Sequence, residues 1–251
     1  MVAGRAKLGI AQGVSVWVLE APAGFGDSHV HAHHAIQITV SLSGALMLAD
    51  ATTTLCAPAI AVAADAPHRF EADGLLAFIF VEPESRAGRA LDRMLFTDGP
   101  LTSIDAEALT PVVAPLAATF EAGLTAEDLL AAGRAAVELL APAGPAPLPD
   151  PRVRRVIEEA TVRMDGSLDA AAAAAGVYLS PSRLRHLFVE QTGLAFKTYQ
   201  LWLRLVRAIE VYAQGKSLTE AAHAAGFSDS AHFSRTFKRT FGLPATTLER
   251  L

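Results

Sequence analysis

Two stretches of the C-terminal region resemble each other closely enough to constrain its fold. Residues 167–193 read SLDAAAAAAGVYLSPSRLRHLFVEQTG, and residues 217–242 read SLTEAAHAAGFSDSAHFSRTFKRTFG. Each copy combines a run of small residues, a short turn, and a second segment with Arg, His and Ser on one side. Small side chains allow two helices to pack closely, as the first helix of a helix–turn–helix requires. This near-repeat therefore predicts two helix–turn–helix units.

The second helix of each unit is expected to be amphipathic, with identifiable ends. In the first copy Ser180-Pro181 begins it, since Ser caps well and Pro suits the first turn, and Gly193 ends it. In the second copy either Ser228 or Asp229 provides the cap. The residues expected to face inward are Leu184, Leu187, Phe188, Phe233, Phe237 and Phe241.

A long helix is predicted between the two units, over residues 196–214. At 1.5 Å per residue it would span roughly 28 Å. Successive major-groove faces of B-DNA lie about 34 Å apart. A rod of this length therefore suits two reading helices placed one turn apart on the same side of a duplex.

At these residues the chain resembles the AraC/XylS family of bacterial transcription regulators. Residues 221–242, followed by Pro244, look like the family's signature, and residues 179–188 match its first unit. The resemblance covers residues 150–251 and implies two helix–turn–helix subdomains that enter successive major grooves. By position, the family's base-reading residues fall on Ser182, Arg185, His186, His232, Ser234 and Arg235.

The remaining basic residues of the two reading helices are expected to hold DNA without reading it. Arg can grip guanine O6 and N7 with two hydrogen bonds, which suits a base-reading role. Contacts to phosphate position a protein on the duplex but carry no sequence information. We assign Arg183, Lys238 and Arg239 to phosphate. The alternative is that all of these charges form a solvated helix surface.

Charge is distributed unevenly along the chain. Residues 1–149 carry 7 basic and 16 acidic residues, a net −9, whereas residues 150–251 carry 14 and 10, a net +4. This asymmetry indicates that only the C-terminal part meets a polyanion. The single cysteine, Cys56, allows no intrachain disulfide, and no apolar run reaches the roughly 20 residues that span a bilayer. Both features favour a cytoplasmic protein.

Five prolines between residues 141 and 151 forbid a helix and mark a semi-rigid linker. Before it, residues 14–82 contain short alternating or β-branched segments that predict strands, with turns at Ser43-Gly44 and Asp73-Gly74. Residues 85–140 change to a helical period. In the last of these helices, Thr125 and Asp128 resemble a capping box. Its apolar stripe would either pack on its own domain or form a dimer seam.

A cluster of histidines lies in the strand-rich region. If His31 and His33 lie at the start of a strand, both side chains point to one face. With Gln37 and Gly44 they resemble the first cupin motif, and His68 after a proline resembles the histidine of the second. The resemblance covers roughly residues 10–82 and implies a small β-barrel.

The histidine cluster departs from the cupin pattern at one position. Gln37 stands where that family has a metal-binding Glu, and an amide is a weak neutral ligand. Three imidazoles could still hold Zn²⁺ or another divalent ion. Otherwise the same residues line a pocket for an organic effector, or merely pack and hydrogen-bond. A divalent metal is thus one alternative, and no cofactor is required.

The sequence as a whole predicts an α+β protein of two domains. Residues 1–140 form a cupin-like β-barrel with flanking helices for sensing and dimerisation, residues 141–150 a linker, and residues 151–251 an all-α DNA-binding domain. The expected function is transcription regulation by a homodimer on double-stranded DNA, controlled by a small-molecule effector. RNA polymerase becomes a partner if the protein is an activator. The alternatives are a metal-dependent cupin enzyme with a DNA-binding tail, and a constitutive DNA-binding protein with a vestigial barrel.

Overall fold

The computed structural model describes residues 5–142, 148–163 and 168–248. Their contacts divide them into two compact units, one containing the chain up to residue 146 and from residue 237, the other containing residues 147–236. Residues 143–147, the centre of the predicted linker, lie outside the described residues. The two units are considered separately below.

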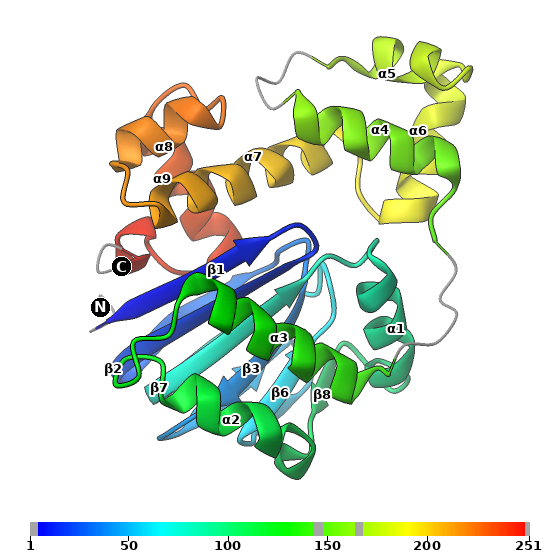
Figure 1. The fold of residues 1–251 in the computed structure, drawn as a ribbon. Helices are drawn as coiled ribbons and strands as arrows, with labels where there is room; N and C mark the ends of the chain where they lie inside the picture. Colours follow the sequence, from blue (N-terminus) through cyan, green and yellow to red (C-terminus); the bar gives the residue numbers. More distant parts are fainter. Residues whose placement is uncertain (1–4, 143–147, 164–167, 249–251) are drawn as a thin grey trace. The chain divides into compact units, whose positions relative to one another are not determined.

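The first unit is built on an antiparallel sheet that, in the described residues, has eight strands (Figure 1). The strands are β1 (Ala6–Ala11), β2 (Val14–His31), β3 (Ile36–Ser41), β4 (Leu46–Ala49), β5 (Thr54–Cys56), β6 (Ala59–Val62), β7 (His68–Val81) and β8 (Leu101–Ser103). The main path runs β1-β2-β7-β3-β6-β8, while β4 pairs with β7 and β5 pairs with β4.

The two longest strands, β2 and β7, bend back to enclose an interior. Their pairing is interrupted where Ala21 pairs with Gly74 and the next pair is Phe25 with Ala72. Gly74 has a φ of +79°, which suits the bend. Phe70 and Phe78, eight residues apart, would be about 26 Å apart on a straight strand. Their ring centroids are 5.6 Å apart, so β7 doubles back.

Side chains of this sheet alternate between an outer, helix-covered face and the interior. Val16 and Val18 of β2 join Ile79 of β7 in a core cluster that contains residues of the helices. Trp17, between the two valines, instead contacts Phe80 with ring centroids 4.8 Å apart. The period-two pattern of β2 therefore separates an aliphatic outer core from an aromatic interior.

The outer face is covered by helices, as Figure 1 shows. They are α1 (Arg86–Leu95), the 3₁₀ turn η1 (Ala106–Leu109), α2 (Thr110–Ala117) and α3 (Ala126–Leu140). The predicted capping box of Thr125 and Asp128 at the start of α3 is confirmed. The apolar stripe of α3 is buried against the sheet, so it packs on its own domain rather than lying free as a dimer seam.

The C-terminal region is entirely helical in its described residues. Its helices are α4 (Pro151–Val162), α5 (Ala170–Gly176), α6 (Pro181–Thr192), α7 (Phe196–Ala213), α8 (Leu218–Ala224) and α9 (Ser230–Phe241), followed by the 3₁₀ turn η2 (Ala245–Leu248). A core that includes Val156, Phe188 and Tyr199 joins α4 to α7. All six residues predicted to face inward from α6 and α9 are buried. The α+β fold class is thereby confirmed.

The helix ends follow from local sequence. The Ser180 hydroxyl accepts a hydrogen bond from the backbone N–H of Arg183, and Gly193 ends α6 with a φ of +79°. Of the two candidate caps for α9, Asp229 accepts a hydrogen bond from the backbone N–H of His232 at 2.6 Å. None of the described helices has both the length and the apolar character needed to cross a membrane.

Candidate nucleic-acid interface and interior histidine site

The reading helix of the first helix–turn–helix, α6, presents its polar predicted residues to solvent. Ser182, Arg183, Arg185 and His186 are all exposed, while Leu184 between them is buried. The helix therefore separates a packing face from a face with two guanidinium groups. Arg185 lies on the exposed surface that the sequence assigned to base reading, and Arg183 lies near it in sequence.

In the second reading helix, α9, the basic residues are exposed, whereas the histidine is packed against the preceding turn. Arg235, Lys238 and Arg239 are exposed, whereas His232 and Ser234 are half-buried. The ring of His232 packs edge-on against Phe227 at 5.1 Å, and its Nδ1 lies 3.2 Å from the Ser228 hydroxyl. His232 thus contributes to the turn in this structure, and the exposed charge of α9 comes from Arg235, Lys238 and Arg239.

One residue of the first turn was not predicted from the sequence. Tyr178, between α5 and α6, has a φ of +58° and is 94% exposed. The left-handed conformation costs an ordinary residue roughly 1–2 kcal/mol. At the corresponding turn of the second helix–turn–helix, Gly226 adopts this conformation, with a φ of +74°. An aromatic ring therefore stands in solvent at the turn that precedes α6. The sequence signal was weak because a single tyrosine in a turn suggests packing.

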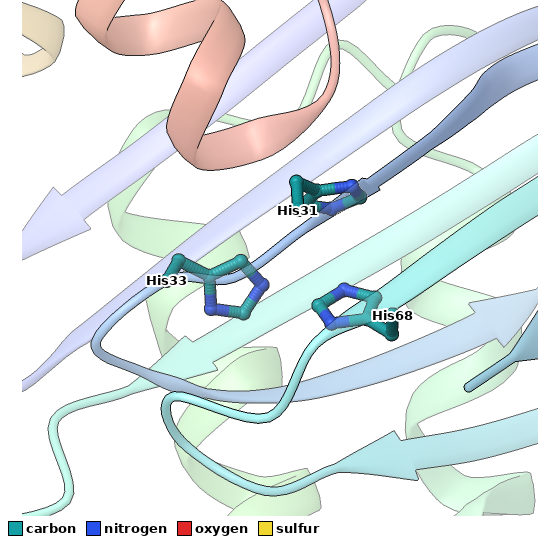
Figure 2. A group of neighbouring side chains, drawn as sticks. All are labelled: His31, His33 and His68. Carbon is teal, nitrogen blue, oxygen red and sulfur yellow. The ribbon is translucent and has the colours of Figure 1, made fainter. Parts of the chain in front are cut away.

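The interior of the first unit brings His31 and His33 together with His68, which is distant from them in sequence. His31 ends β2, His33 lies in the connection to β3, and His68 begins β7. The expectation that His31 and His33 occupy the start of a strand is therefore wrong. The rings converge nonetheless, because β2 and β7 pair at His31 and His68. Figure 2 shows the three imidazoles facing a common centre, and their nearest ligand atoms lie within 4.8 Å of one another.

Backbone carbonyls fix the orientation of these rings. Nδ1 of His33 lies 3.1 Å from the carbonyl oxygen of Ala35, and Nδ1 of His68 lies 2.8 Å from that of Ala66. For His68 this means that Nδ1 carries the proton and donates it, which leaves Nε2 of His68 as a lone pair. Nε2 of His68 is buried and has no hydrogen-bond partner among the described atoms. One strong electron-pair donor thus faces the centre of the cluster unsatisfied.

The electrostatic environment keeps His33 and His68 neutral. Burial, followed by the neighbouring His31, lowers the pKa of His33 to about 4. Burial and the two other histidines also lower the pKa of His68 well below its usual range. Gln37 contributes no charge, and its Oε1 lies 2.9 Å from Nε2 of His33. At neutral pH these two residues therefore present uncharged imidazoles beside an amide.

A neighbouring charged cluster holds the two segments that carry these histidines. His34 lies 2.7 Å from Asp65 through Nδ1, and its Nε2 bonds to the buried Glu84. Burial alone would lower the pKa of His34, but the two carboxylates raise it to about 9. The Asp65 N–H donates to the carbonyl of His33 at 2.9 Å. The sequence did not reveal this cluster, since its members lie 31 and 50 residues apart.

Aromatic side chains form the rest of the interior. A narrow hollow beside Gln37, partly open to solvent, is lined by Trp17, Phe70, Phe78, Phe80, Phe241 and Leu243. Phe80 also contacts His33 edge-on at 5.3 Å, so the aromatic walls and the imidazoles are continuous. This arrangement places apolar ring surfaces beside a few neutral polar atoms, the combination that is typical of small-molecule sites.

Comparisons with known sequences agree with the C-terminal geometry. Residues 171–250 match the family model of a helix-turn-helix domain. The chain is 36% identical over 101 residues to the HTH-type transcriptional regulator GlxA of Rhizobium meliloti, covering 40% of this chain and 31% of that protein. It is 33% identical over 95 residues to the arabinose operon regulatory protein of Escherichia coli, covering 37% and 32%. The match thus spans about a third of these relatives' length.

Comparison with solved structures extends the likeness to the whole fold. ToxT from Vibrio cholerae O395 has a TM-score of 0.61 with 13% identity, over 94% of this chain and 96% of that chain. A ToxT structure bound to an unsaturated fatty acid gives a TM-score of 0.57 with 10% identity, over 97% and 94%. At this identity the likeness concerns the fold alone. Together these findings show a two-part protein whose C-terminal region is a helix–turn–helix domain, similar to those of the matched transcriptional regulators.

Proposed function

We propose that this protein is a sequence-specific DNA-binding transcription regulator. The observation that carries the proposal is the C-terminal pair of helix–turn–helix units, each with an exposed cationic surface on its second helix. The two units are joined by α7, whose 18 residues span about 27 Å. This length suits insertion of α6 and α9 into successive major grooves. Arg185 and Arg235 would read bases, while Arg183, Lys238 and Arg239 would hold phosphates.

Regulation would come from an effector in the interior of the first unit. ToxT is known bound to an unsaturated fatty acid, and its fold resembles this one. In this chain the interior offers aromatic walls together with His31, His33, Gln37 and His68. An effector shifts the protein's state only if it binds two conformations with different affinity. We therefore expect effector binding and DNA binding to be thermodynamically linked.

The same reasoning supports several properties of the whole protein. A homodimer would bring two DNA-binding arms to one promoter and raise the effective affinity. RNA polymerase would be a further partner if the protein activates transcription. The regulator would act in the cytoplasm, where its DNA lies. We propose no enzymatic activity, because the relatives it matches are regulators and no carboxylate among the described residues joins the histidine group.

The proposal is tested with the full chain and a library of random duplexes. Repeated selection should enrich one sequence class, and fluorescence anisotropy should then show at least a roughly 1,000-fold preference over a scrambled duplex at moderate salt. Equal affinity for the two duplexes would refute sequence-specific regulation. Affinity that is specific but unchanged across a ligand screen would instead support constitutive binding with a vestigial barrel.

A further inference from the structure

Three features of the histidine cluster point to a cation as its ligand. His31, His33 and His68 are all buried, and their donor atoms already lie within 4.8 Å of one another. The carbonyls of Ala35 and Ala66 orient the rings of His33 and His68, and this leaves Nε2 of His68 available as a ligand. Metal-binding histidines in proteins are oriented by this kind of second hydrogen bond.

The position of His68 strengthens this interpretation. Its Nε2 is fully buried and has no partner among the described atoms, and leaving such a polar atom unsatisfied is unfavourable. A cation at the centre of the cluster would satisfy it. Tetrahedral coordination at 2.0–2.1 Å places ligand nitrogens about 3.4 Å apart. The donor atoms, now within 4.8 Å of one another, would have to move closer to reach this value.

The donor set also selects the kind of ion. Mg²⁺ and Ca²⁺ require oxygen ligands, preferably carboxylates, and no carboxylate of the described residues belongs to the group. Neutral imidazole nitrogens suit Zn²⁺, Co²⁺, Ni²⁺ and Cu²⁺. Oε1 of Gln37, 2.9 Å from Nε2 of His33, is the nearest additional oxygen. Water or a small ligand would complete the shell.

We propose that His31, His33 and His68 form a binding site for one divalent late-transition-metal ion, with Gln37 at its edge. The ion would join the end of β2 to the start of β7 and to the connection that leads into β3. It would thereby fix one end of the interior in a single arrangement. Its role as the effector of the regulator rests on the function proposed above, whereas its binding does not.

Metal binding is measured directly on chelator-treated full-length protein. Isothermal titration with Zn²⁺ should show one saturable site per chain, and Co²⁺ should produce visible d–d bands that Zn²⁺ abolishes. Mg²⁺ should give no saturable signal. No saturable Zn²⁺ site, or a Co²⁺ spectrum without nitrogen-ligated d–d bands, would overturn the proposal.

Variants assign the ligands. His33→Ala and His68→Ala should each weaken Zn²⁺ affinity by at least about 100-fold. His29→Ala, an exposed histidine close by in sequence, should leave it unchanged. Because the buried alanine variants can fail to fold, Gln37→Glu provides a gain-of-affinity test. The added carboxylate should tighten Zn²⁺ binding by about tenfold or more. Unchanged affinity in Gln37→Glu, or equal loss in His29→Ala, would contradict the assignment.

The same samples separate this inference from the proposed function. Intact sequence-specific DNA binding without a metal site would overturn only the metal proposal. A saturable metal site in a protein with no sequence preference would overturn only the regulator. If both hold, Zn²⁺ should change the affinity for the selected duplex in wild-type protein but not in His33→Ala. An unchanged affinity would remove the ion's role as effector.

Discussion

Ionisation of the Glu82 carboxyl is unfavourable in the folded first unit. Burial, followed by the nearby Glu84, raises the pKa of the Glu82 carboxyl from 4.5 to about 7. The unfolded chain therefore releases this proton at lower pH than the folded chain does. Between pH 4.5 and pH 7 the folded state binds more protons, so its stability falls as pH rises. Ionised Glu82 thus destabilises the fold above neutral pH.

Replacing this carboxyl by its neutral isostere tests the effect. Glu82→Gln should raise the free energy of unfolding at pH 8 by about 1–2 kcal/mol, because the amide needs no charge in the half-buried site. At pH 4, where wild-type Glu82 is protonated, the two proteins should be equally stable. Urea unfolding at both pH values measures this difference. Glu71→Gln, on the exposed surface of β7, is the matched control and should show no such pH dependence.

Arg185 and Lys238 of the reading helices should contribute differently to DNA binding, Arg185 to sequence preference and Lys238 to affinity for any sequence. Arg185→Ala should relax the preference at one position of the selected site by about 1–3 kcal/mol. Lys238→Ala should weaken all sequences alike and reduce the salt-dependence slope by about 1. Anisotropy titrations against single-base variants at several salt concentrations measure both effects. Identical behaviour of the two variants would show that the roles are misassigned.

Single residues of the C-terminal region were predicted well because their signals are local. Ser180, Gly193 and the buried Phe233 could be read from the residues next to them. His34 could not, since its two partners come from distant segments that only the folded sheet brings close. His31 and His33 were correctly chosen as a pair, but for a reason that the structure contradicts, because the strand ends between them.

At the scale of elements, α3 approaches the sheet more closely than an ordinary side chain permits. A Cβ added to Gly133 would lie 2.3 Å from Cγ2 of Val16, which is fully buried in β2. A Cβ added to Gly9 of β1 would lie 2.4 Å from the backbone oxygen of Ala126. Two glycines, one on each side, thus permit this packing.

Substitution of Gly133 decides between two opposing effects. Helix propensity alone predicts that Gly133→Ala stabilises the protein by about 1 kcal/mol. Overpacking against an immobile core valine costs about 1–3 kcal/mol, so we expect a net loss of stability. Gly176→Ala in α5 is the control, because its Cβ would meet nothing nearer than 3.6 Å and should not destabilise. Thermal unfolding followed by circular dichroism compares the two variants.

The sheet was predicted less completely than the helices, for a physical reason. Asp73-Gly74 reads as a turn, yet in the structure it is a bend within the continuous strand β7. A glycine with positive φ serves both purposes, and only the pairing partners distinguish them. Strand pairing depends on residues far apart in sequence, whereas helix caps depend on the next four residues. The apolar stripe of α3 is another case, since its amphipathic pattern could not indicate whether it packs on the sheet or on a second subunit.

At the scale of the whole molecule, two separate cores predict two separable unfolding transitions. One core lies between the sheet and its helices, and the other lies among α4 to α7. Zn²⁺ should raise the midpoint of the first unit's transition alone, since a ligand stabilises the unit it binds. The selected duplex should raise both midpoints, because it would contact α6 in one unit and Lys238 and Arg239 in the other. Calorimetry of the full chain measures this. A single transition that both ligands shift equally would show that the units unfold as one.

Helix α7 has a consequence for how binding sites of such a protein can change. Each residue of a helix adds only 1.5 Å of length but about 100° of rotation. A base pair adds 3.4 Å and roughly 35°. Lengthening α7 by one residue would therefore turn one reading helix away from its groove long before the distance became wrong. The connecting helix therefore fixes the relative rotation of the two reading helices more strictly than their distance. In the DNA between the two halves of a binding site, base substitutions should be tolerated, whereas insertions, which change both the rotation and the distance, should not.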